Sequence, residues 1–217
     1  MTEINYKELS SHIKSAEKEG FSRLYLIHGE ELMCKTALED LLSALLPESA
    51  SDRNHNYHPF DGTGENISDA LEQVNTFSFM SGRKVVAYLD SKIFYSKENE
   101  KSLLEKAKEA HALKDLKKAS RYFISLMSIL KLSFDDVGKE NRRKSLKMDA
   151  GEADSRWIDD ITEYCIGNGI MISGGEETAS FFQKAVEKGF PKGNHLIVTA
   201  EIIDKRLSLY KAVNKNG

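Results

Sequence analysis

The sequence is poor in cysteine: Cys34 and Cys165 are the only two among 217 residues. They lie far apart and form no Cys-x-x-Cys pair, which argues against both a disulfide framework and a thiolate metal site. We therefore expect no metal. Such sparse cysteine fits a reducing cytosol, and neither thiol needs a role beyond packing.

Long apolar runs are also missing. No stretch approaches the ~20 consecutive apolar residues that a transmembrane helix needs. The polar start Met1-Thr2-Glu3-Ile4-Asn5 lacks the basic and then apolar pattern of a secretion signal. We expect a cytoplasmic protein that does not bind a membrane.

The chain has no large excess of charge of either sign, with 31 Lys and Arg against 34 Asp and Glu and a net charge of -3. So weak a field does not attract phosphate, and any DNA contact requires a local patch. The candidate is the basic run at 139–144, followed by Lys147. A charged run between helices is usually a solvated loop, so DNA contact is the minor alternative.

What the sequence does contain is an alternation of short apolar runs with amphipathic stretches. The runs predict strands at 23–28, 57–60, 84–89 and 195–200, the first of them buried on both faces. Helical spacing predicts helices at 6–19, 32–46, 68–74 and 205–213. This alternation implies βαβ units, so we predict an α/β fold with a parallel sheet and right-handed crossovers.

The middle third of the chain has a different pattern. It predicts two or more helices over 97–132, a mobile charged loop at 135–152, and helices at 155–166 and 176–188. We interpret 1–217 as a single domain with a mainly helical insertion at about 97–175. The aromatic residues predicted to pack within this insertion are Trp157, Tyr164, Phe181 and Phe182.

The turn after the first predicted strand is close to a phosphate-binding loop. From Gly29 to Thr36 the chain has the spacing G-x-x-x-x-G-K-[ST], but Cys34 stands before Lys35 in place of the second glycine. That glycine lets the backbone approach phosphates without a Cβ in the way. The two glutamates after Gly29 oppose a polyanion, whereas at a helix start they are favourable against the helix dipole. We interpret the loop as degenerate and expect no nucleotide or other cofactor.

The strand predicted at 84–89 ends at Asp90, which resembles the metal-holding acid of phosphate-loop enzymes. Ser91 stands where the catalytic glutamate of such enzymes follows. We interpret Asp90 as vestigial and assign no catalytic residue.

Three separated stretches resemble one family, the delta subunit of the bacterial DNA polymerase III clamp loader. Leu24–Glu31 is similar to its opening strand and Gly-Glu-Glu turn, and Leu196–Ala212 to the end of its first domain. Thr76–Val86 is similar to a segment in which an apolar pair precedes a small residue, basic residues and a strand. The resemblance implies an AAA+-like sheet that has lost its ATP site. The family's later domains are absent from this chain, and its typical pattern does not account for the insertion at 97–175.

The resemblance also implies a function. It indicates a non-catalytic subunit that binds and helps open the sliding clamp during DNA replication. The implied partners are the clamp (beta) and the tau/gamma and delta prime subunits, with DNA as a further partner through the assembled complex. The family's clamp anchor is an apolar pair, which falls on Phe79 and Met80, and such side chains often fill a partner's pocket. For nearby Phe77 we predict a core position instead.

Two other function classes stay open. One is an active ATPase with an atypical phosphate loop, and the other is an α/β scaffold whose helical insertion binds an unrelated partner. The conformation of the loop from Gly29 to Thr36 tests the ATPase alternative. An active loop curls around an anion-sized space, whereas in a degenerate loop side chains fill that space.

Overall fold

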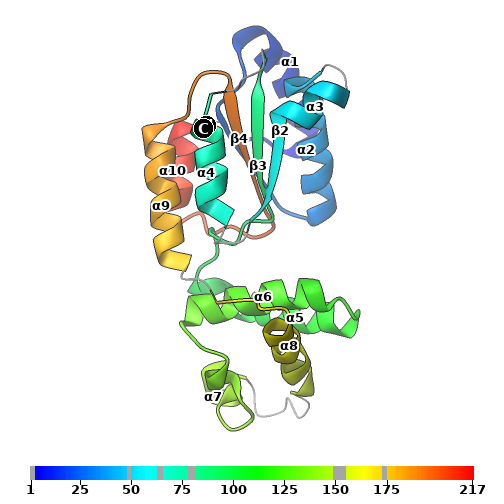
Figure 1. Ribbon diagram of the computed structural model, residues 1–217, viewed down its shortest axis with the longest axis vertical. Helices are drawn as coiled ribbons and strands as arrows, with labels where there is room; N and C mark the ends of the chain where they lie inside the picture. The colour runs from blue at the N-terminus through cyan, green and yellow to red at the C-terminus, as the bar shows by residue number, and fades with distance from the viewer. Residues whose placement is uncertain (1–2, 48–49, 63–65, 78–81, 149–154, 173–174) are drawn as a thin grey trace. The chain divides into compact units, whose positions relative to one another are not determined.

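The computed structural model describes residues 3–47, 50–62, 66–77, 82–148, 155–172 and 175–217. The chain divides into two compact units, one made of Met1–Phe94 with Glu176–Gly217 and the other of Tyr95–Gly175. The first contains the sheet and is called the sheet unit here. The second consists of helices and turns and is called the helical unit (Figure 1).

Four parallel strands form the sheet, in the order β1-β4-β3-β2. They are β1 (Leu24–His28), β2 (Tyr57–Asp61), β3 (Lys84–Leu89) and β4 (Asn194–Ala200). The predicted α/β fold with a parallel sheet is therefore confirmed. The central strands β3 and β4 are almost completely buried. The strand β1 was predicted to be buried on both faces, but only Leu24 is buried, because β1 forms an edge of the described sheet.

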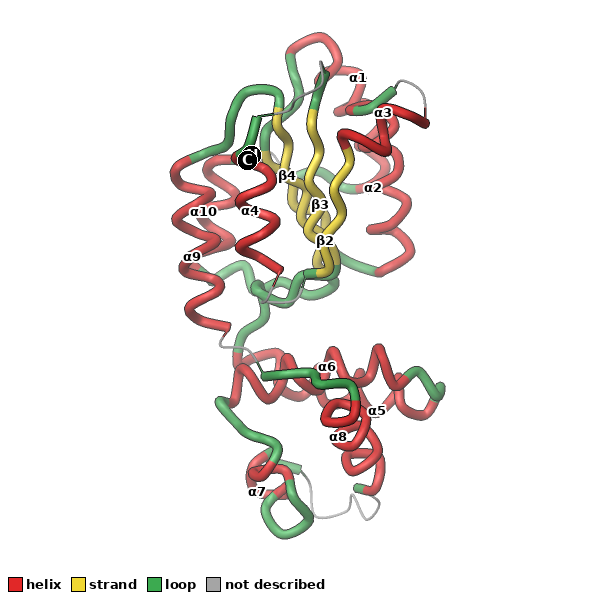
Figure 2. Tube along the Cα trace, in the orientation of Figure 1, coloured by secondary structure: helices red, strands yellow, loops and turns green. Residues whose placement is uncertain are grey.

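Helices cover both faces of the sheet (Figure 2). On one side lie α1 (Leu9–Glu19), α2 (Glu31–Leu45) and α3 (Ala50–Asn56), and on the other α4 (Ile67–Asn75), α9 (Gly175–Lys188) and α10 (Ser208–Asn216). Alternate residues of a strand point to opposite faces. In β3, Val85 packs in the core under α2, whereas Val86 and Tyr88 pack in the core with α4, α9 and α10.

The helix α9 belongs to the sheet unit, which corrects the predicted role of its aromatic pair. Phe182 was predicted to pack within the insertion, yet it is buried in the sheet core, where its ring stacks on Tyr88 with centroids 6.3 Å apart. The adjacent Phe181 is exposed. Consecutive residues on a helix point about 100° apart, so Phe182 can face the sheet core while Phe181 faces outward.

The helical unit contains α5 (Glu100–Ala112), α6 (Leu116–Leu130), α7 (Arg142–Ser145) and α8 (Arg156–Gly167). Its centre is apolar and includes Leu103, Ala107, Phe123, Leu126, Met127, Trp157, Ile158, Ile161 and Cys165. The rings of Phe123 and Trp157 meet edge to face at 6.3 Å, so the predicted packing role of Trp157 is confirmed.

Part of the basic run at 139–144 is not a solvated loop. Arg142 begins α7 and is only 2% exposed. One of its guanidinium nitrogens donates to the Ser155 carbonyl at 2.6 Å, and another pairs with the carboxylate of Asp159. The side chain thus joins α7 to the start of α8 and is not available to a DNA phosphate.

None of the described helices combines the length and the apolar composition needed to cross a membrane.

Candidate functional site

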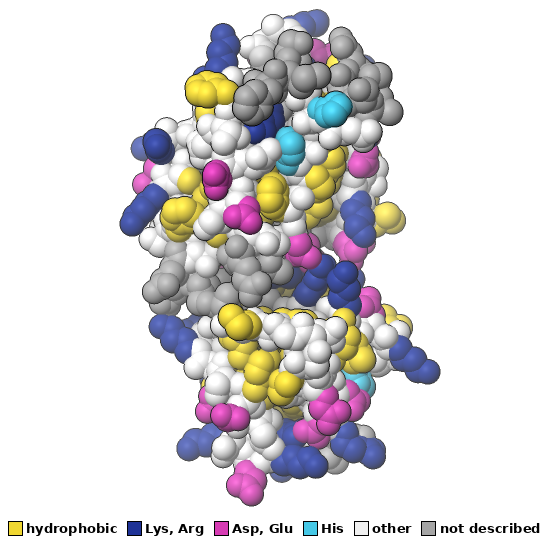
Figure 3. Space-filling model, viewed as in Figure 1, with side chains coloured by type: hydrophobic (Ala, Val, Ile, Leu, Met, Phe, Trp, Pro, Cys, Tyr) yellow, Lys and Arg dark blue, Asp and Glu magenta, His cyan; other side chains and the backbone are white. Residues whose placement is uncertain are grey.

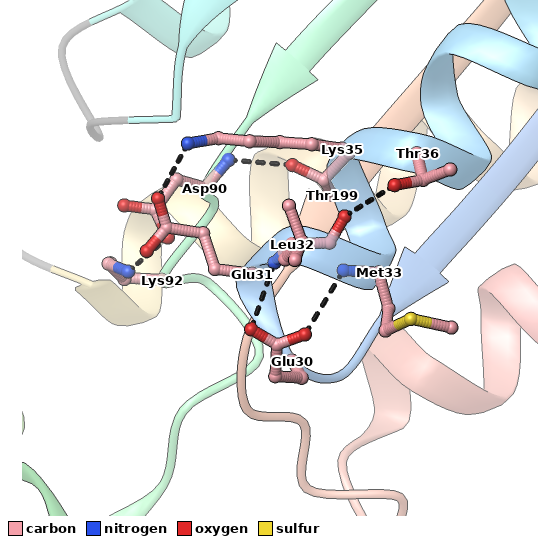
Figure 4. Close-up of polar contacts among 9 residues, drawn as sticks. All are labelled: Glu30, Glu31, Leu32, Met33, Lys35, Thr36, Asp90, Lys92 and Thr199. Atoms are coloured by element: carbon pink, nitrogen blue, oxygen red, sulfur yellow. Dashed lines mark hydrogen bonds and ion pairs between the residues drawn. The ribbon is translucent and has the colours of Figure 1, made fainter.

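The loop from Gly29 to Thr36, which was predicted to be a degenerate phosphate loop, lies at the carboxyl end of the sheet, where open parallel sheets bind their ligands. Gly29 follows β1 and turns the chain towards α2 with a φ of +128°, a value that an L side chain rarely adopts. Asp90 follows β3, and Glu201 follows β4. Because β4 lies between β1 and β3, the three strand ends meet at one edge (Figure 4).

The N-terminus of α2 is occupied by the chain's own Glu30. Its carboxylate accepts hydrogen bonds from the backbone N–H groups of Leu32 at 3.1 Å and Met33 at 3.2 Å (Figure 4). The first N–H groups of a helix have no partner within the helix, and in a phosphate loop they bind the phosphates. The sequence indicated that glutamate is favourable here, and the geometry shows Glu30 as a helix cap.

The other two loop side chains also bond within their own helix. Lys35 Nζ lies 2.7 Å from a carboxylate oxygen of Glu31, one turn earlier, and the Thr36 hydroxyl donates to the Leu32 carbonyl at 2.9 Å. In a working phosphate loop, the lysine reaches the phosphates and the hydroxyl binds Mg²⁺. In this arrangement both groups bond to residues of α2 itself (Figure 4).

Cys34 is buried where the motif has glycine, with its sulfur 3.5 Å from the Gly29 carbonyl oxygen. Burial, and to a smaller extent the negative charges of Glu30, Glu201 and Asp90, raise the pKa of the Cys34 thiol to about 11. Those three carboxylates therefore act together on this end of the sheet.

Asp90 is held from two sides. Its backbone N–H donates to the Thr199 hydroxyl at 2.8 Å, and its carboxylate pairs with Lys92 Nζ at 2.5 Å (Figure 4). Its φ of +55° lies in the left-handed region that aspartate tolerates better than most residues. The contact of Asp90 with Lys92 could not be predicted from the sequence, because a lysine two residues after an acid is too common a pattern.

Among the residues that the structure describes, no group of three or more His, Cys, Asp or Glu side chains could hold a metal ion.

The predicted clamp-binding segment lies between α4 and β3. Phe79 and Met80 fall outside the described residues, so their contacts stay a prediction. Phe77 is described and is 83% exposed, and the prediction of a core position for it was wrong. The physical reason is that α4 ends at Asn75, so Val74 is the last buried side chain before the chain leaves the sheet.

Comparisons with known proteins give one match. No curated protein and no solved structure matches the chain. A family model does match over residues 25–126, from β1 into α6. The family model thus covers α5 and most of α6, which had been placed outside the family pattern. That model is described as DNA polymerase III, delta subunit, so residues 25–126 of this chain are similar to the delta subunit of that DNA-replication enzyme.

Proposed function

We propose that this chain is the clamp-gripping N-terminal part of a clamp-loader delta subunit and does not hydrolyse ATP. The main support for this proposal is that the Glu30 carboxylate accepts hydrogen bonds from the backbone N–H groups at the N-terminus of α2. A phosphate could reach these groups only by displacing Glu30, and it would then face the charges of Asp90 and Glu201.

An AAA+-like fold is part of the proposal. What supports it is the strand β1 leading through the loop at Gly29 into α2, with β4 and its Thr199 beside β1 and with Asp90 at the end of β3. The order of strand, loop and helix is thus that of a phosphate site. The backbone N–H groups of α2 and the side chains of Lys35 and Thr36, however, already have bonding partners within the chain. Such an arrangement favours a role in binding a protein over a role in hydrolysis.

The partner on this proposal is the sliding clamp, within an assembly that includes the tau/gamma and delta prime subunits. On this proposal DNA is a partner through the assembled complex. On the face shown in Figure 3, Lys and Arg side chains are interspersed with Asp and Glu, and neither sign covers a continuous area. That surface suits a protein partner better than a DNA backbone.

The first test is calorimetric titration with Mg-ATP, for which we expect no heat of binding. The matched variant is Cys34→Gly, which restores the glycine of the motif. This variant should also show no heat of binding, because Glu30 still accepts hydrogen bonds from the N–H groups at the start of α2. Micromolar affinity in the unaltered chain would overturn the loss of nucleotide binding.

The second test concerns the clamp anchor. Removing a central apolar anchor typically costs ~2 kcal/mol or more, so Phe79→Ala with Met80→Ala should weaken clamp binding by at least about thirtyfold. The fold should survive. Phe181→Ala, at an exposed aromatic residue of α9, is the control and should leave the affinity unchanged. A folded double variant that binds the clamp normally would remove the pair from the site.

A second candidate function has one observation in its favour. The helical unit exposes three large apolar side chains: Leu113, Ile166 and Met171. Exposed apolar residues can mark a contact surface, so a scaffold role for this unit is the alternative. Clamp binding that is lost on mutating these residues, while the double alanine variant binds normally, would favour it.

A further inference from the structure

Two large apolar side chains are exposed at the start of α2. Leu32 is 67% exposed and Met33 is 42% exposed, and both lie in the first turn of this helix. The Met33 side chain points away from Asp90, and thus away from the carboxyl end of the sheet (Figure 4). Keeping adjacent apolar side chains in water costs free energy, which burial against a partner recovers.

Tyr6 adds an aromatic ring to the same side of α2. It is 41% exposed and begins the short 3-10 helix Tyr6–Glu8, and its hydroxyl donates to the Asp40 carboxylate at 3.3 Å. Asp40 follows Met33 by seven residues, which is about two helical turns, so both lie on one face of α2. Tyr6, Leu32, Met33 and Asp40 are together called the α2 surface here.

The α2 surface carries a negative charge that no cation balances. The other charges on the exposed side of α2 form ion pairs, Glu31 with Lys35 and Glu39 with Arg53. Asp40 differs from them, because within the described part of the chain its carboxylate contacts the tyrosine hydroxyl and pairs with no Lys, Arg or His. The α2 surface thus combines an aromatic ring, apolar side chains and an unpaired carboxylate.

This combination suits an arginine side chain. A guanidinium group stacks on an aromatic ring by cation–π attraction and donates to a carboxylate at the same time. It is more weakly hydrated than the ammonium group of lysine, so less free energy is lost when a contact removes it from water. Apolar side chains around such a contact exclude water and strengthen it.

We propose that the α2 surface binds a protein partner through an arginine that stacks on Tyr6 and pairs with Asp40, while apolar side chains of the partner cover Leu32 and Met33. The inference rests on the proposed function, because it takes the partner to be a neighbouring subunit of the clamp loader. The helices α2 and α4 cover opposite faces of the sheet (Figure 2). A clamp bound next to α4 therefore leaves the α2 surface to another subunit.

The test measures the affinity of the whole chain for a complex of the tau/gamma and delta prime subunits and, separately, for the clamp. Leu32→Gln with Met33→Gln should weaken binding to the complex by at least about tenfold, because the apolar contact is lost. Both residues are exposed, so circular dichroism should show an intact fold. Phe181→Gln, the same kind of change at an exposed residue of α9, is the matched control and should leave both affinities unchanged.

Variants of Tyr6 and Asp40 test the arginine. Tyr6→Leu should weaken binding to the complex about threefold, whereas Tyr6→Phe keeps the ring and should bind normally. Asp40→Asn should weaken binding by about threefold or more and make the affinity less sensitive to salt, because it removes the charged contact. Equal binding by the two Tyr6 variants, or an Asp40→Asn variant that binds normally, would overturn the arginine contact.

Clamp binding separates failure of this inference from failure of the proposed function. A folded variant of Leu32 and Met33 that binds the complex normally overturns the inference, as does a chain that binds the clamp but not the complex. Either result leaves the proposed clamp binding intact. Clamp binding that weakens in the same variant would assign the α2 surface to the clamp and overturn the choice of partner. A chain that binds neither protein rejects the inference together with the proposed function.

Discussion

At the scale of single residues, Glu30 has the clearest physical role. A side chain that accepts from two N–H groups in the first turn of a helix satisfies donors that otherwise need water or a ligand. Its negative charge also interacts favourably with the helix dipole. The residue that we propose to hinder nucleotide binding is therefore also the residue that caps α2.

We predict that Glu30→Ala lowers the free energy of unfolding by ~0.5–2 kcal/mol, the usual cost of losing an N-terminal cap. Urea unfolding monitored by circular dichroism measures the change. Glu31→Ala is the neighbouring control and should cost at most ~0.5 kcal/mol, because it removes one exposed ion pair along the helix. Equal changes in the free energy of unfolding for the two substitutions would show that the Glu30 cap stabilises α2 no more than an exposed ion pair does.

At the scale of elements, the turn after β2 is fixed by a close approach of backbone. The N–H of Gly62 donates to the Leu89 carbonyl, and the end of β3 passes directly over this glycine. A Cβ at position 62 would lie 2.6 Å from the Ser91 Cα, closer than two such carbons can be. Only glycine fits there without a shift of the strand end that carries Asp90.

Gly62→Ala should therefore destabilise the protein by about 1–3 kcal/mol, the typical cost of forcing extra atoms into a packed site. Gly167→Ala provides the comparison. Gly167 is the last residue of α8, its Cβ would meet nothing within 4 Å, and alanine favours helix. The melting temperature should fall for the first variant and hold or rise slightly for the second. If Gly167→Ala lowered the melting temperature more than Gly62→Ala, the backbone around Gly62 would be able to shift and accommodate a Cβ at little cost.

Periodicity predicted most elements closely, because continuous apolar runs and amphipathic faces are local properties of a sequence. The range predicted for β3 is the observed one, and α2 differs by one residue at each end. The helix α3 was missed, because Ala50–Asn56 is polar and has no apolar face. The helix α10 begins at Ser208 and not at 205, because the Asp204 side chain accepts from the Arg206 N–H and holds a turn there.

The candidate site was predictable only in part. The loop at Gly29 and Asp90 were found from the sequence because each follows an apolar strand. The contacts of Asp90 with Thr199 and Lys92 depend on the order of the strands, which no local pattern gives. Exposure of Phe77 depends on where α4 ends, and a one-turn error there changes a surface residue into a core residue.

At the scale of the whole molecule, the chain consists of two compact units with separate apolar centres. The family match crosses from one unit to the other, since it begins in β1 and ends in α6. The helical unit is therefore at least partly a family feature and not wholly an addition.

We predict that residues 95–175 fold when expressed alone. Their apolar centre draws on α5, α6 and α8, and Arg142 ties α7 to α8 within the same unit. A unit of this size is only marginally stable, so we expect helical circular dichroism with a cooperative but low melting transition. A spectrum without helix, or a gradual loss of signal, would show that this unit needs the sheet unit to fold.

The Glu30 cap has a consequence for the chain's dependence on its surroundings. A protein that binds nucleotide at a helix terminus becomes more stable as the ligand concentration rises, by mass action. Glu30 is covalently part of the chain, so the N–H groups that it satisfies have a partner at every nucleotide concentration. If the chain binds no nucleotide, as proposed, the folding equilibrium at this terminus is independent of the energy state of the cell. The sheet unit is then equally well formed when ATP is scarce and when it is plentiful.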